Sequence, residues 1–344
     1  MKHSRFRLPA EWEPQAGVII AWPHEATDWA PRLDEIETAY AGLARTIARF
    51  EPLIVCVADA SVRDRAARRL EAAGIAAGRV RFVDVEYDDT WLRDSGPITL
   101  ADGNDFRLLD FRFTGWGGKY GASRDDRVVE TLVAGGLFRA SVHQRIEWAL
   151  EGGAIESDGK GTILTTWRCL HQRHPDMERD EMTRRLTDAF AAERVLWLDH
   201  GYLEGDDTDA HIDTLARFAP DDAIVFQACD DMADPHYDQL ARMREELTAL
   251  RTLDGRPYRL HALPWARAIV DDGRRLAASY ANYLIVDGGV VIPSYGDPND
   301  AKAAAVIAAA HPGREIVPVD ARPLIWQNGS VHCLTMQVPR GALA

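Results

Sequence analysis

Short apolar runs joined by turn residues recur along the chain and predict β-hairpins. Runs rich in β-branched and aromatic residues that flank Asp-Gly or a similar pair are typical of hairpins. The four clearest turns lie at Asp102-Gly103, Asp158-Gly159, Pro220-Asp221 and Asp287-Gly288. Their spacing lengthens along the chain, but the recurrence persists, which predicts one local unit used several times.

A helical pattern follows each hairpin. Apolar residues at helical spacing predict helices over residues 124–135, 176–192, 237–251 and 299–310, and a first helix over 33–50. In the first helix, the residues expected to share one apolar face are Ile36, Tyr40, Leu43 and Ile47. Asn299 and Asp176 are the predicted N-caps of their helices.

The repeated unit is therefore a hairpin, a helix and a further strand. Four such units and a split first one make five modules, and repeats of this kind build closed or stacked architectures. We expect an α/β fold with circular pseudo-symmetry. Without a linker, a low-complexity segment or a shift in composition, residues 1–344 are predicted to form a single domain. The alternative is a doubly wound parallel sheet, against which the many hairpins count.

Composition narrows the possible partners and the compartment. The net charge of −14 disfavours binding to nucleic acid or to an anionic membrane surface, and weakly favours a cationic ligand. The chain has no apolar run long enough for a bilayer, and residues 1–17 lack an apolar signal core. The four cysteines are far apart and form no C-x-x-C pair, so we expect a reduced, cytoplasmic protein.

Polar residues that could take part in catalysis or binding lie where the hairpins begin. Asp94 and Glu151 precede the first two hairpins, His211 and Asp213 open the third, and Cys333 lies on the predicted last strand. If the modules surround an axis, equivalent strand starts converge there. These five side chains are then expected to be neighbours.

The alternation of side chains along strands suggests partners within this group. His211 and Asp213 are two residues apart and would point the same way, whereas His332 and Cys333 are adjacent and would point apart. The predicted base for Cys333 is therefore His211 and not His332.

Each of these residues also has a structural interpretation. An isolated cysteine in an apolar run is more often inert core, as expected for Cys56, Cys169 and Cys229. An aspartate before Ser-Gly-Pro is usually a turn residue, and Glu151 could be a solvated strand end. The acidic segment 205–213 could hold a metal, but it lacks the EF-hand spacing, and neither an HExxH motif nor paired histidines are present. No metal is therefore predicted.

With those residues identified, the chain resembles the agmatine deiminase family and the related bacterial-type peptidylarginine deiminases. The matching motifs occur in order through nearly the whole chain: PAEWEPQAGVIIAWP, DDTWLRDSGP, GWGGKY, LEGGAIESDGKGTILTT, GDDTDAHIDTLARF, ASYANYLIVDGGVVIPSYGDPND and NGSVHCLTMQ. The chain departs from the family where Asn-Gly before the histidine becomes Asp209-Ala210, where a triple glycine becomes Gln327-Asn328-Gly329, and in residues 167–176. The resemblance implies a five-bladed α/β propeller and a homo-oligomer.

The resemblance also implies roles for the site residues. Cys333 would be the nucleophile, His211 the general acid/base and Glu151 the group that orients it, while Asp94 and Asp213 would clamp a guanidinium. Trp91 and Trp116 are candidates for stacking on the substrate. The implied reaction is cofactor-free hydrolysis of agmatine to N-carbamoylputrescine and ammonia. Free arginine, peptidylarginine or methylated arginine remain alternative substrates, and a non-catalytic binding protein and a metal-dependent hydrolase remain alternative functions.

The two clamping carboxylates have an electrostatic consequence for the nucleophile. Like charges disfavour an anion, so Asp94 and Asp213 should disfavour the Cys333 thiolate in the free protein. A docked cation should reverse this effect. We therefore hypothesise that substrate binding helps to generate the nucleophile.

Overall fold

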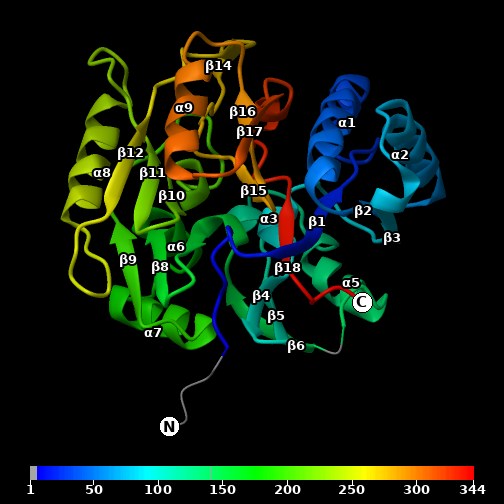
Figure 1. Cartoon of the computed structure of the whole chain (residues 1–344), viewed down its shortest axis with the longest axis horizontal. Coiled ribbons are helices and arrows are strands. Elements are labelled where there is room, and N and C mark those ends of the chain that lie inside the picture. Colours follow the sequence, from blue (N-terminus) through cyan, green and yellow to red (C-terminus); the bar gives the residue numbers. More distant parts are fainter. Residues whose placement is uncertain (1–5, 140) are drawn as a thin grey trace.

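The structure is a computed structural model that describes residues 6–139 and 141–344. The prediction about a signal core rests on residues 1–17, of which 1–5 lie outside the described residues. Strands form several small mixed sheets in the middle of the molecule, and most of the longer helices lie at its periphery (Figure 1). Among the described residues, no helix is both long and apolar enough to cross a bilayer.

Four sheets of the described chain share one pairing pattern, in which an antiparallel hairpin is followed by a third strand parallel to the second. They are β4 (Ile98–Asp102), β5 (Asp105–Arg112) and β6 (Val142–Ala149); β7 (Ile155–Ser157), β8 (Thr162–Thr166) and β9 (Arg194–Leu198); β10 (Ala216–Ala219), β11 (Ala223–Gln227) and β12 (Arg259–Leu263); and β15 (Leu284–Val286), β16 (Gly289–Ser294) and β17 (Glu315–Asp320). All four predicted hairpins are present.

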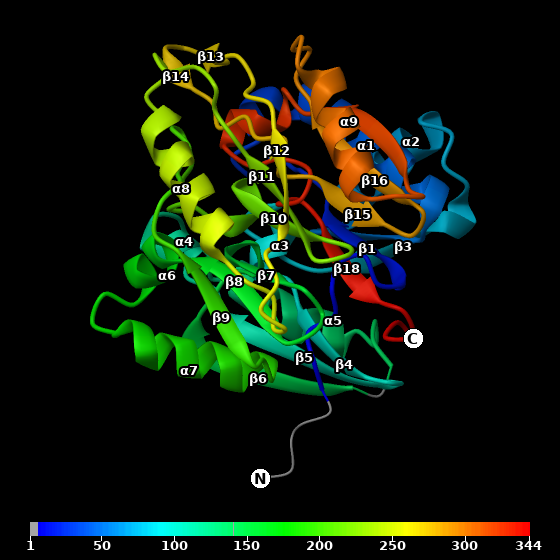
Figure 2. The ribbon, with the colours of Figure 1, turned by 60° about the vertical axis from the view of Figure 1, so that its left-hand side comes forward.

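A fifth sheet joins the two ends of the chain. The C-terminal strand β18 (Met336–Pro339) pairs antiparallel with β1 (Gln15–Ala21), which continues in parallel to β2 (Leu53–Val57) and β3 (Val80–Asp84). β18 and β1 lie side by side in both views (Figures 1 and 2). This is the split first module that the sequence predicted. A short ribbon of β13 (Val270–Asp271) and β14 (Arg274–Arg275) lies outside the pattern.

The helices connect the strands. They are α1 (Leu33–Phe50), α2 (Ala60–Ala72), α3 (Leu92–Ser95), α4 (Gly115–Gly118), α5 (Val128–Ala134), α6 (Trp167–Arg173), α7 (Arg179–Phe190), α8 (Tyr237–Ala249) and α9 (Asp300–Ala310). Short 3-10 turns lie at Ala30–Arg32, Ala77–Arg79, Asp125–Arg127, Gly152–Ala154, Ile212–Thr214 and Leu324–Gln327. All five predicted helices occur, with ends that differ by a few residues.

The apolar face predicted for α1 is buried. Ile36 and Ile47 share a core with Val18 of β1, Val55 of β2 and Val291 of β16. α1 therefore packs against two different sheets. Full burial of one such aliphatic side chain contributes about 1.5–3 kcal/mol relative to exposure, so this face supplies much of the reason for the helix to form.

Of the two capping predictions, one was correct in position and the other was wrong. Asn299 occupies the N-cap position of α9, but its side chain makes no capping bond and instead donates to the Trp265 carbonyl. Helix α7 begins after Glu178, not after Asp176. A short polar side chain near a helix start can satisfy other backbone groups, and tertiary contacts decide which.

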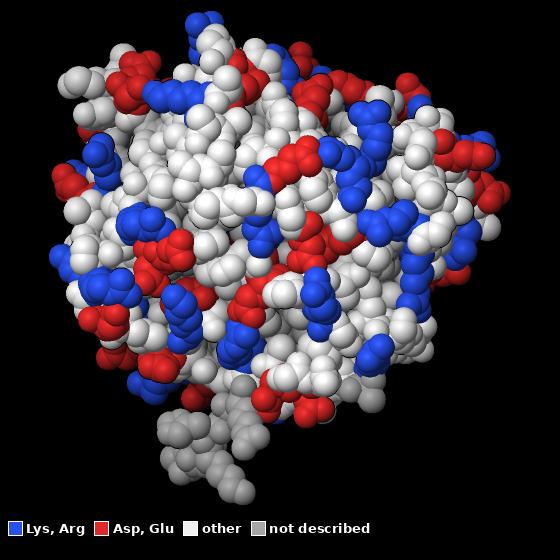
Figure 3. All heavy atoms as spheres, in the orientation of Figure 1, with Lys and Arg blue, Asp and Glu red and all other residues white. Residues whose placement is uncertain are grey.

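Acidic and basic side chains are interspersed over the face seen in Figure 3. Many of them are ion-paired across neighbouring elements, for example Arg49 with Glu315 and Arg340 with Asp287. Exposed pairs of this kind contribute little to stability individually.

Glu51, directly after α1, is a buried carboxyl whose burial raises its pKa to about 8, with a further contribution from the charge of Asp287. Since the folded pKa exceeds the unfolded value of 4.5, the folded protein holds this proton more tightly, and stability falls as pH rises from about 4.5 to 8. We expect Glu51→Gln to raise the free energy of unfolding by about 1–3 kcal/mol at pH 8 and much less at pH 5.

Urea denaturation of the two proteins at both pH values checks this prediction. Glu71→Gln is the matched control, because Glu71 is exposed at the end of α2. An equal effect of Glu51→Gln at pH 5 and pH 8 would contradict the assignment.

Candidate active site

Five predicted site residues lie a few positions before the first strand of an antiparallel pair, in turns and short helices: Asp94, Glu151, His211, Asp213 and Cys333. Asp94 belongs to α3 before β4, and Glu151 immediately precedes the 3-10 turn that leads into β7. His211 and Asp213 lie at the 3-10 turn before β10, and Cys333 lies in a turn before β18. We call these the leading residues of their hairpins.

The leading residues of two modules converge on one glycine of a third module. A Cβ atom at Gly153 would lie 2.7 Å from both Asp94 Oδ1 and His211 Nδ1, and 3.1 Å from Asp213 Oδ2. The Gly153 N–H donates to Asp94 Oδ1 at 3.0 Å. Only a residue without a side chain allows these three ionisable groups to meet here.

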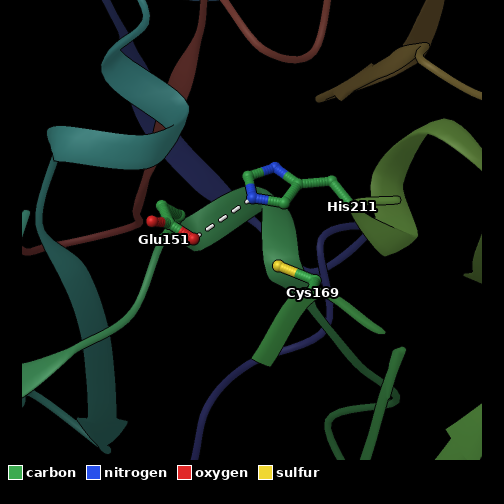
Figure 4. A group of neighbouring side chains, drawn as sticks. All are labelled: Glu151, Cys169 and His211. Atoms are coloured by element: carbon green, nitrogen blue, oxygen red, sulfur yellow. Dashed lines mark hydrogen bonds and ion pairs between the residues drawn. The ribbon is translucent and has the colours of Figure 1, made fainter. Parts of the chain in front are cut away.

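His211 is held by Glu151 (Figure 4). Its Nε2 lies 3.3 Å from Glu151 Oε2, and the second oxygen of Glu151 accepts from Arg173 Nε at 2.8 Å. Burial alone would raise the pKa of Glu151, but the hydrogen bond from His211 and the charge of Arg173 lower it to about 2. Burial also favours neutral His211, yet the charge of Asp94 and the contacts with Cys169 and Glu151 hold its pKa well above the usual value. These contacts favour the protonated form of His211.

Cys169 joins this cluster unexpectedly. It was interpreted from sequence as inert core, and it is fully buried with its pKa raised by burial. Its sulfur nevertheless points towards the His211 ring (Figure 4).

Two buried polar atoms of the site lack partners within the described residues. They are Nδ1 of His211 and Oδ1 of Asp213. The nearest carboxylate oxygen to that Nδ1 is Asp94 Oδ1, at 3.6 Å and without hydrogen-bond geometry. Because buried polar groups are almost always satisfied, water or a bound ligand is expected to contact these two atoms.

Cys333 does not lie on a strand, which corrects the prediction. Residues 331–334 form a turn, closed by hydrogen bonds from the Leu334 N–H to the Ser330 carbonyl and from the Thr335 N–H to the His332 carbonyl. The alternating pattern of this stretch resembles a strand, but it lacks a neighbouring strand before Met336. His211 and Asp213 are likewise in a turn, so alternation along a strand cannot be the reason for their orientation.

The Cys333 sulfur faces carboxylates. Sγ lies 3.5 Å from Asp213 Oδ2 and 3.1 Å from Asn282 Nδ2. Burial raises the pKa of this thiol well above its usual value, and the charges of Asp213 and Asp94 raise it further. The predicted rise in the pKa of Cys333 is confirmed, although burial is a larger cause than the charges of the two carboxylates.

His332 supports Asp213 instead of the sulfur. Its Nδ1 lies 2.8 Å from Asp213 Oδ2, and its Nε2 lies beside Arg217 and Glu11. Burial and the charges of Arg217 and Arg93 lower the pKa of His332, opposed by the charge of Glu11 and by the hydrogen bond between Nδ1 and Asp213. No hydrogen bond joins His211 to Cys333 in the described chain, but each contacts the pair formed by Asp94 and Asp213.

The site opens into a cavity of about 370 Å³. Cys333 and Asp94 lie in its wall with the two predicted tryptophans, Trp91 and Trp116. Trp116 donates from Nε1 to Asp94 Oδ2 at 2.9 Å. Its backbone is left-handed, with φ of 56°, inside a glycine-rich turn that brings the indole to the cavity.

Two clusters carry the donor types of a metal site: Glu151 with Cys169 and His211, and Glu11 with Glu156 and His332. In each, an arginine already neutralises the carboxylates, Arg173 in the first and Arg217 in the second. The acidic segment considered from sequence does not converge on one point, because Asp206 bonds its own turn while Asp209 pairs with Lys119 and Arg173.

Sequence reasoning missed Asn282 and Arg173. Arg173 ion-pairs with Glu151, and no local pattern marks such a long-range pair. Asn282 could have been found, because the hairpin of β15 and β16 was the only predicted hairpin to which no leading residue was assigned.

Comparisons with known proteins place this geometry among deiminases. The sequence profile of the Porphyromonas-type peptidyl-arginine deiminase family matches residues 7–339. An agmatine deiminase of Pseudomonas aeruginosa is 34% identical, covering 97% of this chain and 95% of that protein. A solved structure from Porphyromonas gingivalis, described as a candidate arginine deiminase, is 42% identical with a TM-score of 0.90, covering 98% and 100% of the two chains. A cysteine-to-serine variant of the C. jejuni agmatine deiminase with substrate bound is 30% identical, also with a TM-score of 0.90, covering 98% and 97%.

The buried pair of Arg173 and Glu151 yields a stability prediction. Both side chains are inaccessible, with exposures of 0% and 1%, so removal of the cation leaves an uncompensated buried carboxylate. We expect Arg173→Met to lower the free energy of unfolding by about 3–5 kcal/mol, and the double variant with Glu151→Gln to recover part of it.

Urea denaturation at pH 7 measures these changes. Arg185→Met, which breaks the exposed pair with Glu181, is the control and should cost no more than about 1 kcal/mol. Similar losses in Arg173→Met and Arg185→Met would show that the buried pair does not have this role.

Proposed function

The chain belongs to the Porphyromonas-type peptidyl-arginine deiminase family, and on this basis we propose that it hydrolyses agmatine to N-carbamoylputrescine and ammonia through a covalent adduct on Cys333. One observation carries the proposal beyond family membership. Asp94 and Asp213 converge beside the Cys333 sulfur. Two buried polar atoms at the same place, His211 Nδ1 and Asp213 Oδ1, have no hydrogen-bond partner among the described residues.

A guanidinium fits this arrangement because it is a planar cation with several N–H donors. Asp94 and Asp213 each accept from it, and Asp213 Oδ1 supplies one acceptor that is unused in the free protein. Burial raises the pKa of Asp94 to about 6, helped by the charges of Asp213 and Glu151 and opposed by His211. The cation restores the charge balance, and the carboxylates hold its carbon in reach of the sulfur.

The thiol of Cys333 loses its proton to solvent as the cation binds. The thiolate then attacks the guanidinium carbon, and a carbon–sulfur bond forms in a neutral tetrahedral adduct. His211, protonated before the reaction, donates its Nδ1 proton to one nitrogen, whose bond to carbon breaks so that ammonia leaves. A cationic thiouronium on Cys333 and a neutral His211 remain.

Water completes the reaction. Neutral His211 takes one proton from the water that attacks the thiouronium carbon, and the second adduct expels the sulfur. The ureido product leaves, the departing ammonia is protonated in solution, and Cys333 and His211 return to their starting states. Glu151 keeps His211 oriented throughout. These steps require neither a metal nor a redox cofactor.

The mouth of the cavity supports a substrate with a second positive charge. Asp28 and Asp89 line it, and neither has a basic partner within the described residues. Burial raises the pKa of Asp89 to about 7, with contributions from Asp125 and Asp28. The terminal ammonium of agmatine would relieve this accumulation of negative charge. Trp91 and Trp116 would flank its aliphatic chain.

Arginine or peptidylarginine is the second candidate substrate, and Arg274 is the observation that favours it. Arg274 also lines the mouth, where it donates to the Trp326 carbonyl and to Asn328 Oδ1. Such a cation could pair with a substrate carboxylate. The relatives named as agmatine deiminases and the engagement of Arg274 by these two acceptors favour agmatine.

The finer architecture also belongs to the proposal. Four sheets with the same pairing, a fifth that adds one parallel strand and is closed by β18, and convergence of the leading residues support a five-bladed propeller in one domain. A reducing compartment such as the cytoplasm suits a free catalytic thiol. A homo-oligomer remains a prediction.

Ammonia release tests the proposed function. With agmatine, arginine and an arginine-containing peptide as substrates, we expect agmatine to be the best and Cys333→Ala to lose roughly 10⁴-fold or more in rate. Cys229→Ala, a cysteine far from the cavity lining, should retain the wild-type rate. Turnover that persists in Cys333→Ala, or that EDTA abolishes, would refute the mechanism, and release from none of the substrates would favour a binding protein.

Titration of the Cys333 thiolate absorbance tests the electrostatic hypothesis. An unreactive guanidinium ligand between Asp94 and Asp213 should lower the raised pKa of Cys333, because its positive charge offsets both carboxylates. The same titration of Cys333→Ala corrects for other thiols. An apparent pKa that is unchanged by the ligand would disprove substrate-assisted activation.

A further inference from the structure

We propose that Asn328 is a specificity-determining residue, whose side-chain amide bridges Arg274 and Asp207 at the rim of the cavity and closes that side of the rim to a guanidinium carried by a polypeptide. This inference rests on the proposed function, since it concerns the cavity in which that reaction would occur. It restricts the substrates to small, free guanidinium compounds.

The three bridged residues lie at the outer end of the cavity. Cys333 and Asp94, which stand beside the expected position of the guanidinium, are 3% and 5% exposed. Arg274 is exposed, and Asp207 and Asn328 are half-buried. All five residues line the same cavity. This gradient of exposure places the bridge at the rim, where a substrate has to pass.

The bridge uses both ends of the Asn328 amide. Arg274 Nη1 donates to Asn328 Oδ1, and Asn328 Nδ2 donates to Asp207 Oδ2. A flipped amide would set its NH₂ group against a guanidinium and its oxygen against a carboxylate, so the two partners fix its orientation. Hydrogen bonds to ionised groups are stronger than those between neutral groups, and both partners here are ionised at neutral pH.

Each end of the bridge has a further anchor. Arg274 also donates from Nη2 to the Trp326 carbonyl. The Asp207 carboxylate accepts from the Tyr120 hydroxyl at 2.7 Å, and the Asp207 carbonyl accepts from Lys119 Nζ at 2.5 Å. Segments that are far apart in the sequence are therefore connected along one side of the rim.

The backbone at Asn328 makes the bridge a separable feature. Its φ is 73°, a left-handed conformation that glycine adopts freely and that asparagine tolerates better than most residues. The turn itself therefore does not need a side chain at this position, and what the side chain contributes is the bridge. Replacement by glycine removes the bridge without straining the turn.

The space behind the bridge suits a small molecule. Its volume of about 370 Å³ is near the lower end of the range for ligand pockets. A guanidinium on a short alkyl chain ends inside such a cavity, whereas an arginine within a peptide continues in two directions from its Cα atom. The ribbon that carries Arg274 cannot easily yield, because Gly205 lies so close to the Arg275 carbonyl that a Cβ atom would not fit. A bridged rim therefore disfavours the peptide.

Two probes without a second charge separate size from charge. They are n-butylguanidine and a tripeptide of arginine between two glycines with both ends blocked. In an ammonia-release assay we expect the wild type to favour butylguanidine by about 100-fold or more in kcat/KM, and Asn328→Gly to reduce this preference about 10-fold. Asn104→Gly, at an exposed asparagine in the turn between β4 and β5, is the matched control and should keep the wild-type preference. A wild type that treats both probes alike would overturn the proposal.

A second variant breaks the bridge from its other end. Arg274→Met removes the cation and should reduce the preference by a similar factor. Because both substitutions break one bridge, the variant that carries both should show little further change. An unchanged preference in the two single variants, or fully additive effects in the double variant, would contradict a role for the bridge.

Binding separates a failure of this inference from a failure of the proposed function. If no substrate releases ammonia from the wild type, the proposed function fails. Calorimetric titration of the two probes into Cys333→Ala, with and without Asn328→Gly, then compares dissociation constants in the absence of turnover. Weaker discrimination against the tripeptide in the variant with Asn328→Gly supports the inference, and equal discrimination in the two proteins overturns it.

Discussion

The accumulation of buried negative charge at the centre of the molecule is the constraint on which the rest of the structure depends. Asp94, Glu151 and Asp213 are each at most 5% exposed, and such groups cannot remain ionised without compensation. Arg173 compensates Glu151 from one side, and His332, backed by Arg217, compensates Asp213 from another. Asp94 has only His211, at a distance too long for a hydrogen bond. Asp94 is therefore the least compensated of the three carboxylates.

Whether the pKa of each carboxyl is raised or lowered follows from how closely a cationic group contacts it. The pKa of Glu151 falls to about 2 and that of Asp213 is also lowered, since both have firm donors. The pKa of Asp94 rises to about 6, because burial outweighs what His211 supplies. The charge of Asp94 raises the pKa of His211, and it adds to burial and the charge of Asp213 in raising the pKa of Cys333. A protonated acid and a suppressed nucleophile are therefore two effects of one field, and the arrival of a cation changes both.

Much of the fold and of the candidate site could be predicted from the sequence. Turn pairs such as Asp158-Gly159 fix the hairpins locally, and the repetition of hairpins implies that their leading residues meet, as Asp94, His211 and Asp213 do around Gly153. The prediction was wrong in placing the site residues on regular strands, because they lie in turns and short helices. Long-range contacts made by Arg173 and Asn282 leave no local pattern, and alternation along a strand could not describe the turn around Cys333.

The turn before His211 shows why regular structure ends there. Asp209 and Ala210 have φ of 65° and 73°, a left-handed conformation that is costly for alanine and that glycine would adopt freely.

The surrounding contacts hold the strained turn in place. Asp209 pairs with Lys119 and Arg173, the Asp206 carboxylate accepts from the Ala210 N–H, and Thr166 donates to the Ala210 carbonyl. Strain of about 1–2 kcal/mol per residue persists only where neighbours over-determine the backbone. Since Arg173 also holds Glu151, one arginine fixes both the backbone that presents His211 and the carboxylate that orients its ring. The position of the acid/base therefore depends on the same cation that compensates the buried Glu151 carboxylate.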